Sequence, residues 1–253
     1  MLFLTTLLVG LGAGGFGGLV GLGGGVVMIP LMMRFAALHQ HQAHGTSLMA
    51  LVFTGAAGAA TYYLEGSVDA AAAACLAATA MLTAPLGALF ANRLSEKRLK
   101  GCFGVFIIVV AWILLAKPYF ALFATPTAGW SRVLILLASG LGAGFLSGMM
   151  GVGGGSIMVP AMVLLAGFGQ HGAQGTSLLA MVPAGAVGAV THARLGNVVT
   201  PLLPGLIPGI IVGTCLGGIL AHLLSEGALR IIFAVILTWQ GIRDVRRAAA
   251  MEQ

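Results

Sequence analysis

The chain has 253 residues, of which 59% are hydrophobic and only 7% are charged. A soluble domain usually carries about 25% charged residues, so this composition excludes a water-soluble fold and predicts an integral protein of the lipid bilayer. The net charge of +6 does not indicate a nucleic-acid partner, because the Lys and Arg residues lie between apolar stretches and form no basic patch with interleaved aromatic residues.

Apolar stretches follow one another along the chain in two groups of four, which predicts an all-α polytopic membrane protein. A membrane-spanning helix needs about 20 apolar residues, and three stretches of each group roughly fit that length. The first stretch of each group is too long for one helix, so it could be one span followed by a short broken piece that turns back. The first group covers residues 2–33, 48–64, 68–92 and 101–123, and the second group covers 132–168, 178–195, 198–223 and 229–242.

The second group of stretches repeats the first at a constant offset, which carries position 11 onto position 141 and position 45 onto position 175. The match continues through the polar loops without an insertion, which chance similarity between apolar segments would not produce. We therefore predict two homologous transmembrane halves, 1–125 and 131–253, with a linker at 126–130. The matching runs include LGAG at 11–14 and 141–144, Gln40–His41 and Gln170–His171, GTSL at 45–48 and 175–178, and Leu94–Ser95–Glu96 and Leu224–Ser225–Glu226.

The twelve Lys and Arg residues distinguish two topologies. If each half crosses the membrane four times, the halves are parallel and the cations divide equally between the two sides. If the first stretch of each half forms a hairpin, the halves are inverted and the cations divide nine to three. The positive-inside rule favours inverted repeats with both termini in the cytoplasm. The nine are Arg34, Arg93, Lys97, Arg98, Lys100, Arg194, Arg243, Arg246 and Arg247, and the three are Lys117, Arg132 and Arg230.

The run GLGGGVVMIP at 21–30 returns as GVGGGSIMVP at 151–160, which places helix-weakening residues twice inside predicted membrane segments. Glycines free backbone N–H groups and permit positive φ, and freed N–H groups in a concave turn bind anions. Irregular backbone is tolerated at membrane depth where it lines a cavity or is covered by protein. A tight helix crossing that needs small residues is the alternative, but the doubled break favours binding. The predicted substrate-binding residues are Gly21, Gly23, Gly24, Gly25 and Pro30 in the first half, and Gly151, Gly153, Gly154, Gly155 and Pro160 in the second.

A second repeated motif follows each break, as QHQAHGTSL at 40–48 and QHGAQGTSL at 170–178. Thr46 or Ser47, and Thr176 or Ser177, suit the N-cap of the helix that follows. A helix N-terminus beside a broken helix is a place for an anion, so these four residues are also predicted to bind substrate. No Lys or Arg lies inside a predicted midplane segment, so the anion is expected to bind weakly and to leave easily.

The histidines His39, His41 and His44 invite a metal interpretation, but the second half retains only His171 and has Gln174 in place of His44. Zinc sites need a closed set of ligands, and no carboxylate or cysteine lies nearby in the sequence, so neither a metal nor a cofactor is expected. His44 and Gln174 are predicted to be neutral hydrogen-bond donors to the substrate. His44 could also link transport to protons near neutral pH.

The doubled G-x-G-G-G-x-x-x-x-P motif, followed in each half by a G-T-S run, resembles the TauE/SafE sulfite exporter family, also called the 4-toluene sulfonate uptake permease family. The resemblance covers essentially the whole chain. It implies a carrier of the bacterial inner membrane for sulfite or organosulfonates such as sulfoacetate, often directed outward. It also implies that both glycine–proline motifs lie on the path of a small anionic substrate.

Three other readings of the sequence stay open. The carrier could take up organosulfonates instead of exporting them, and glycine-rich loops can also line an anion channel. An intramembrane enzyme would need a nucleophile and a base, and the candidates Ser47 or Cys75 with His44 belong to no catalytic motif, so no enzyme is expected. Small-residue helix faces would permit a homodimer without requiring one.

Overall fold

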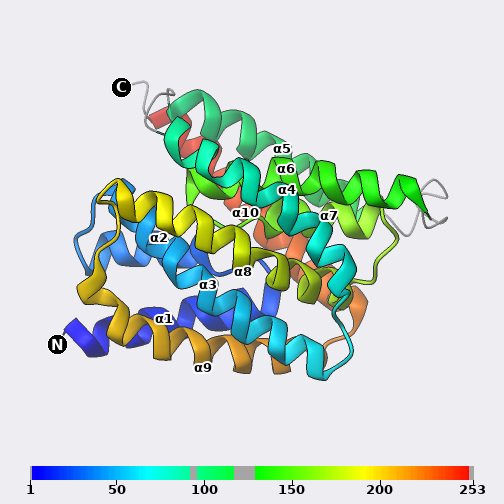
Figure 1. Ribbon diagram of the computed structural model, residues 1–253, viewed down its shortest axis with the longest axis horizontal. Coiled ribbons are helices and arrows are strands. Elements are labelled where there is room, and N and C mark those ends of the chain that lie inside the picture. Colours follow the sequence, from blue (N-terminus) through cyan, green and yellow to red (C-terminus); the bar gives the residue numbers. More distant parts are fainter. Residues whose placement is uncertain (1, 92–95, 117–128, 251–253) are drawn as a thin grey trace.

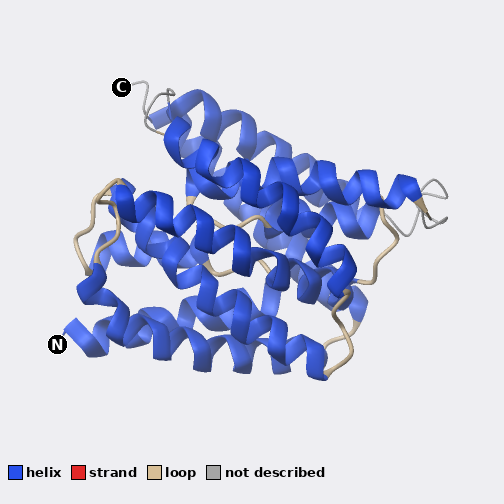
Figure 2. Cartoon of the chain, viewed as in Figure 1, coloured by secondary structure: helices blue, strands red, loops and turns tan. Residues whose placement is uncertain are grey.

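A computed structural model describes residues 2–91, 96–116 and 129–250 of the chain. Within these ranges every regular element is a helix, and Figure 2 shows the loops that join them. The helices are α1 (Leu2–Val20), α2 (Gly25–Phe35), α3 (Gln40–Leu64), α4 (Ala70–Phe90), α5 (Glu96–Ala116), α6 (Trp130–Met150), α7 (Gly155–Leu164), α8 (Gln170–Arg194), the 3-10 turn η3 (Thr200–Leu202), α9 (Leu203–His222) and α10 (Glu226–Ala250).

The order of the helices repeats with the offset seen in the sequence. α3 and α8 correspond at both ends, because that offset carries Gln40 onto Gln170 and Leu64 onto Arg194. It also carries Gly25, where α2 begins, onto Gly155, where α7 begins. Helices α1–α5 and α6–α10 are therefore the same series of five elements. The linker predicted at 126–130 lies mostly outside the described residues.

Each half packs its first helix against the fourth helix of the other half (Figure 1). α1 lies along α9 and α6 lies along α4, and in both pairs the contacts advance in the same direction along the two helices. Glycines at every fourth position allow this approach, since a Cβ atom there would overlap the partner's backbone. The facing positions are Gly10 with Leu206, Gly14 with Ile210 and Gly18 with Thr214 in the first pair, and Gly140 with Leu76, Gly144 with Ala80 and Gly148 with Ala84 in the second.

The two equivalent helices α3 and α8 cross each other and run in opposite directions. Gly55 of α3 faces Leu178 near the start of α8, while Gly185 of α8 faces Leu48 near the start of α3. α5 and α10, which are also equivalent, pair in the same antiparallel sense. The contacts between the halves are thus reciprocal, as in an assembly with a two-fold relation.

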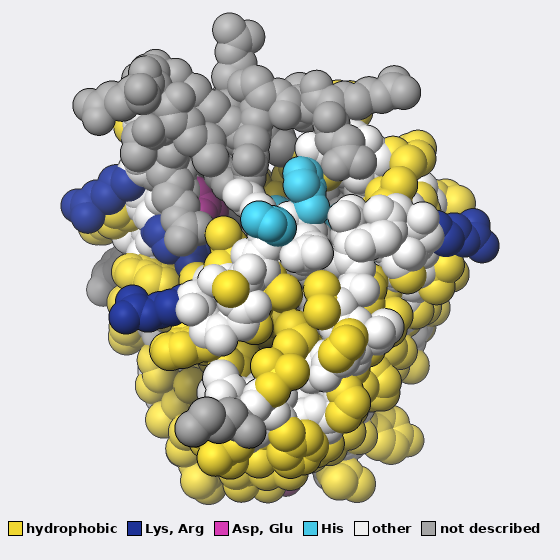
Figure 3. Space-filling view, turned by 90° about the vertical axis from the view of Figure 1, so that its left-hand side faces the viewer, with side chains coloured by type: hydrophobic (Ala, Val, Ile, Leu, Met, Phe, Trp, Pro, Cys, Tyr) yellow, Lys and Arg dark blue, Asp and Glu magenta, His cyan; other side chains and the backbone are white. Residues whose placement is uncertain are grey.

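Six helices of the described chain are long and apolar enough to cross a membrane, namely α1, α3, α4, α6, α8 and α9. This is three for each half, but within the described residues the fourth predicted stretch of each half, 101–123 and 229–242, is not among them. Large apolar side chains such as Leu82, Leu134 and Leu216 are exposed on their outer faces, where lipid would cover them. Figure 3 looks onto the end of the bundle near both termini, where histidine and cationic side chains gather above a hydrophobic flank. The chain is a multi-pass membrane protein.

The predicted starts of two helices are wrong. Apolarity alone placed these starts at 48 and 178, but α3 begins at Gln40 and α8 begins at Gln170. The N-cap residues are accordingly His39 and Gly169, so the threonines and serines of the G-T-S motifs lie about two turns inside the helices and cap neither of them. Polar residues are tolerated there because they bond to the other half of the molecule.

Candidate functional site

The first glycine run interrupts the helix between α1 and α2. Gly21, Gly23 and Gly24 adopt φ values of 71°, 84° and 77°, a left-handed region that only glycine enters without strain. The chain then reverses direction. This brings Gly24 so close to the carbonyl oxygen of Ala13 that no side chain would fit between them. α2 therefore folds back beside α1 and starts from a buried turn.

The second glycine run forms the equivalent turn between α6 and α7. Gly151 and Gly153 adopt φ values of 66° and 93°, but Gly154, the N-cap of α7, has a right-handed φ of −77°. Both glycine runs lie in the interior, since residues 21–26 and 151–156 are all buried. The prediction of two broken helices is therefore confirmed by the backbone.

The two breaks lie against each other. A Cβ atom at Gly25 would come within 2.5 Å of the carbonyl oxygen of Gly151, and Gly155 is packed in the same way against Gly21. Gly23 in turn faces the side chains of Leu51 and Met181 near the crossing of α3 and α8. Equivalent residues of the two halves thus meet at one place inside the bundle.

Each break faces the G-T-S motif of the opposite half, a pairing that the sequence did not reveal. The single hydroxyl proton of Ser177 can go to Gly21 O at 3.0 Å or to Gln174 O of its own helix at 2.8 Å. That of Ser47 can go to Gly151 O or to His44 O, both at 2.8 Å. The side chain of Gln174 packs against Gly21, and the backbone of His44 packs against Gly151. The predicted glycines, serines, His44 and Gln174 are therefore brought together, but across the halves and not within them.

Side-chain donors cover the carbonyl oxygens at the C-terminal ends of α1 and α6. The Tyr62 hydroxyl lies 2.9 Å from Gly18 O and 3.0 Å from Gln174 Oε1, and its single proton can go to either acceptor, while His192 Nε2 donates to Gly148 O at 2.9 Å. One turn later, the hydroxyl groups of Ser177 and Ser47 lie against the carbonyl oxygens of Gly21 and Gly151. The negative ends of these two helices are thus partly neutralised by the protein.

The N–H groups at the starts of α2 and α7 are left without such partners. Among the described residues, no acceptor receives a hydrogen bond from the backbone N–H groups of residues 22–26 or 152–156. A buried N–H group without an acceptor is costly and uncommon. Two helix N-termini that meet in the interior with free donors form a site of positive potential, which suits a small anion.

The threonines of the G-T-S motifs have a different role from the serines. Thr46 Oγ1 accepts the backbone N–H of Val199 and Thr176 Oγ1 accepts that of Asp69, both at 3.0 Å. These bonds tie the start of α3 or α8 to the loop that precedes the fourth helix of the other half. Both threonines are fully buried and are held away from the breaks.

The two prolines lie inside α2 and α7, on the second turn past the breaks. Because proline lacks an N–H, Pro30 leaves the carbonyl oxygen of Val26 without its helical donor. Arg243 Nη1 of α10 donates to that oxygen at 3.2 Å. Arg243 lies one residue past the predicted stretch 229–242, so this contact was not foreseen, and the equivalent position in the first half is Ile113.

The side chains around the two breaks differ. At the first break, Gln174 Oε1 lies 3.0 Å from the Tyr62 hydroxyl, and Gln174 Nε2 has no partner among the described residues although the side chain is fully buried. At the second break, His44 and His192 occupy the equivalent places. A cavity beside the second break is lined by Ser147 together with glycines of that break.

Comparisons with known proteins agree with this architecture. The chain is 29% identical to the "Probable membrane transporter protein YunE" of Bacillus subtilis, over 81% of this chain and 85% of that protein. It is also 29% identical to a "Probable membrane transporter protein" of Xylella fastidiosa, over 76% of each chain. No solved structure matches the chain significantly. The profile of the family "Sulfite exporter TauE/SafE" matches residues 6–243, so the chain belongs to the TauE/SafE family of membrane transporters.

Proposed function

We propose that this transporter is a secondary carrier that exports a small sulfur-containing oxyanion, such as sulfite or an organosulfonate of the sulfoacetate type, across the bacterial inner membrane. The observation that carries the proposal is the pair of buried helix starts, at 22–26 and 152–156, whose N–H groups have no acceptor in the described chain. The family name supports the substrate class.

The chemistry of the site suits an oxyanion that must also be released. A sulfite or sulfonate group presents three oxygens, and backbone N–H groups at a helix start can donate to several of them without a full positive charge. Gln174 Nε2 adds a donor without a protein partner. The nearest described cation, Arg243, uses one N–H on Val26 O and lines a cavity with Val152 and His44, so the proposed donors at the breaks themselves are backbone N–H groups with partial charges, which suits an anion that must also leave.

The substrate-binding roles that we assign follow this geometry. We assign the direct donors to the backbone of the two breaks, and the shaping of the site to the residues that hold the breaks in place. Thr46, Thr176, Pro30 and Pro160 act from a distance, through the loops and through α2 and α7. The assigned residues are Gly21, Gly23, Gly24, Gly25, Pro30, His44, Thr46, Ser47, Gly151, Gly153, Gly154, Gly155, Pro160, Gln174, Thr176 and Ser177.

We also propose that the halves are inverted repeats, with both termini in the cytoplasm. The antiparallel crossing of the equivalent helices α3 and α8 supports this, since it fits a two-fold axis in the membrane plane. Inverted repeats with broken helices that meet at the midplane are typical of carriers that work by alternating access. Tags at the two termini that are protected from the medium in intact cells would support the orientation, and accessible tags would reject it.

Counterflow in proteoliposomes tests the carrier. Vesicles loaded with unlabelled sulfite, sulfoacetate, sulfolactate, taurine or sulfate are supplied with labelled sulfite or sulfoacetate outside, with and without a pH gradient of either sign. Saturable, trans-stimulated flux of one of the sulfur compounds supports a carrier, and flux without saturation or counterflow would indicate an anion channel. The gradient that drives net flux decides between export and uptake, and a chemically altered substrate would indicate an enzyme.

A further inference from the structure

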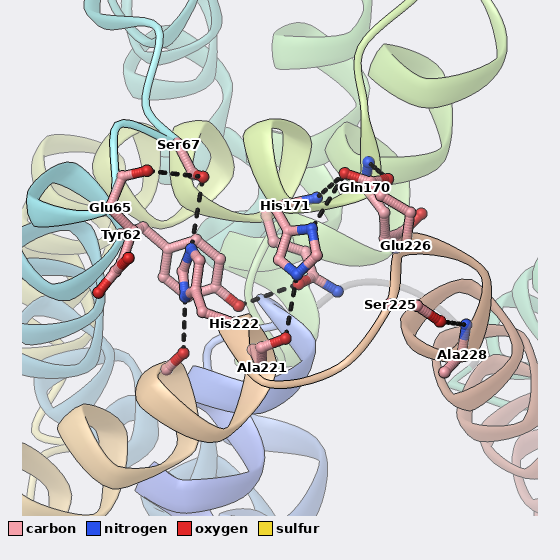
Figure 4. A network of polar contacts seen from close by, with 12 residues as sticks. Tyr62, Glu65, Ser67, Gln170, His171, Ala221, His222, Ser225, Glu226 and Ala228 are labelled. Carbon is pink, nitrogen blue, oxygen red and sulfur yellow. Dashed lines mark hydrogen bonds and ion pairs between the residues drawn. The ribbon is translucent and has the colours of Figure 1, made fainter.

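A cluster of titratable side chains lies at one end of the bundle, where α3 ends, α8 begins and α9 turns into α10. Figure 4 shows Tyr62, His171, His222 and Glu226 facing one another across this corner. The rings of His171 and His222 are 5.1 Å apart, and His222 contacts the Tyr62 ring edge-on at 4.5 Å. These residues come from four different helices, so their contacts hold the corner together.

His171 is placed between two hydrogen-bond acceptors. Its Nδ1 lies 3.0 Å from a carboxylate oxygen of Glu226, and its Nε2 lies 3.0 Å from the carbonyl oxygen of Ala221 in the last turn of α9. A neutral imidazole has one N–H and can donate to only one of them, whereas an imidazolium donates to both. The geometry therefore fits the protonated form of His171.

Glu226 also binds the first turn of α8. Its carboxylate accepts the backbone N–H groups of Gln170 and His171, which are free donors at that helix start. Partial burial alone would raise the pKa of Glu226, but these hydrogen bonds and the contact with His171 outweigh it and hold the pKa below its usual range. The carboxylate thus stays ionised at neutral pH and is available to pair with an imidazolium.

The other charged groups near this corner leave His171 as the partner of Glu226. On α9, His222 uses its Nδ1 on Gly218 O at 2.8 Å and points its Nε2 toward Ser67. On the side of α4 and α6, Asp69 pairs with Arg132 at 3.0 Å. On α10 the next charged residue is Arg230, one turn beyond Glu226. From α3 the cluster receives the neutral phenol of Tyr62, and the C-cap Glu65 of that helix accepts from Ser67 through its backbone oxygen.

The cluster is connected to the first helix break. His171 lies three residues before Gln174 on the first turn of α8, and Gln174 packs against Gly21 and meets the Tyr62 hydroxyl. Tyr62 in turn bonds to Gly18 and contacts His222. A displacement of the start of α8 from the corner would therefore move Gln174 relative to the break.

We propose that His171 is a proton-binding site whose imidazolium, by bridging Glu226 and the end of α9, latches this end of the carrier closed. Binding one proton supplies the second N–H that the two acceptors require. When that proton is lost, one of the two bonds fails, and the start of α8 is released from α9. The latch is therefore engaged at acidic pH and open at alkaline pH. Only its effect on flux rests on the proposed function.

Hydrogen–deuterium exchange of the full-length protein in lipid nanodiscs tests the latch without any substrate. Exchange in residues 170–178, corrected for the intrinsic pH dependence of amide exchange, is compared at pH 5.5 and pH 8. We expect it to rise about tenfold in the wild type, the effect of losing one charge-assisted hydrogen bond. In His171→Gln it should be high at both pH values.

Matched variants keep the test decisive. His41→Gln changes the equivalent histidine of the other half and should retain the wild-type response, while Glu226→Gln keeps the imidazole and should weaken the response. Unchanged exchange along the packed pair α4 and α6 shows that a variant has folded. A wild type without pH response, or a His171→Gln protein that keeps it, would overturn the proposal.

Flux in proteoliposomes is a separate arm of the experiment. A pH response of exchange that His171→Gln abolishes, in a protein that transports none of the sulfur compounds, would leave the latch standing and reject the proposed carrier function. Transport of a sulfur compound by a protein whose exchange shows no pH response would support the carrier function and reject the latch.

Discussion

The two helix breaks share a backbone plan but differ in their details. In both halves a helix ends in a glycine turn, a second helix starts from buried N–H groups, and a serine of the opposite half bonds to the first glycine. Gly24, however, has a left-handed φ of 77°, whereas its counterpart Gly154 has a right-handed φ of −77°. The first break is therefore the more constrained of the two.

The side chains at the two breaks differ more than the backbone does. The first break has the neutral pair Gln174 and Tyr62, and the second has His44 and His192. Arg243 supports the broken helix of the first half, while the second half has Ile113 at the equivalent position. The two breaks thus offer equal backbone donors to the proposed site, whereas their unequal side chains allow its two ends to respond differently.

The largest difference between the two breaks is expected when the N-cap glycine of α2 or of α7 is replaced by alanine. Gly24→Ala forces a left-handed residue, at about 1–2 kcal/mol, and places a Cβ atom on Ala13 O, so we expect about 2–5 kcal/mol of destabilisation and loss of most flux. Gly154→Ala meets its nearest atoms at 3.0 and 3.1 Å and should cost about 1 kcal/mol or less. Thermal unfolding in detergent and counterflow measure the two effects.

Leucine at either position provides the harsher version of the same test. Gly24→Leu and Gly154→Leu should each abolish flux while membrane insertion stays intact, because a large side chain fills the break. Full activity in both leucine variants would refute the proposed site. Equal destabilisation by the two alanine variants would show that the backbone difference between the breaks has no energetic consequence.

The second test concerns the serines that join the halves. Ser177→Ala and Ser47→Ala each remove one donor from a buried carbonyl oxygen, which costs about 1–3 kcal/mol. The two bonds have lengths of 3.0 and 2.8 Å, so the losses in unfolding temperature should be similar. Ser139→Ala, whose hydroxyl bonds only within its own helix α6 to Ile135 O, is the control and should change little. A lower unfolding temperature in only one of the two variants would show that the two serines do not make equivalent contributions to stability.

Much of the fold was predictable from the sequence because membrane helices depend on apolarity and glycine patterns. The internal repeat, the succession of apolar helices and the position of both breaks all follow from composition and motif spacing. The starts of α3 and α8 were not predictable in the same way. A polar first turn and second turn are stable there only because Thr46, Ser47 and their counterparts bond to the opposite half.

The set of residues that packs around each break could not be predicted from the sequence either. Residues 40–48 follow the first break closely in the chain, yet they pack against the second, since pairing between halves depends on the tertiary crossing of α3 and α8. No local pattern encodes that exchange. Arg243 was missed for a related reason: its partner is a carbonyl oxygen released by Pro30, in the opposite half of the chain.

A third prediction tests the unequal polar side chains. Gln174→Met keeps the shape of the side chain but removes the free Nε2 donor at the first break, so we expect about a tenfold rise in the half-saturation constant for the anion, equivalent to about 1.4 kcal/mol. His44→Gln gives the second break the residue found at the first and should change the constant less. Concentration-dependent counterflow measures both. An unchanged constant in Gln174→Met would remove this residue from the site.

The smallest effect is expected from Arg243→Ile, which gives α10 the residue found at the equivalent place on α5. The bond from Nη1 to Val26 O is lost, but the corresponding carbonyl in the second half, released by Pro160, faces a helix that offers isoleucine there. We therefore expect about 1 kcal/mol of destabilisation or less and nearly full flux, measured by thermal unfolding and counterflow. Strong loss of flux with normal stability would mean that the cation acts on the anion itself, because a purely structural bond could not separate the two readouts.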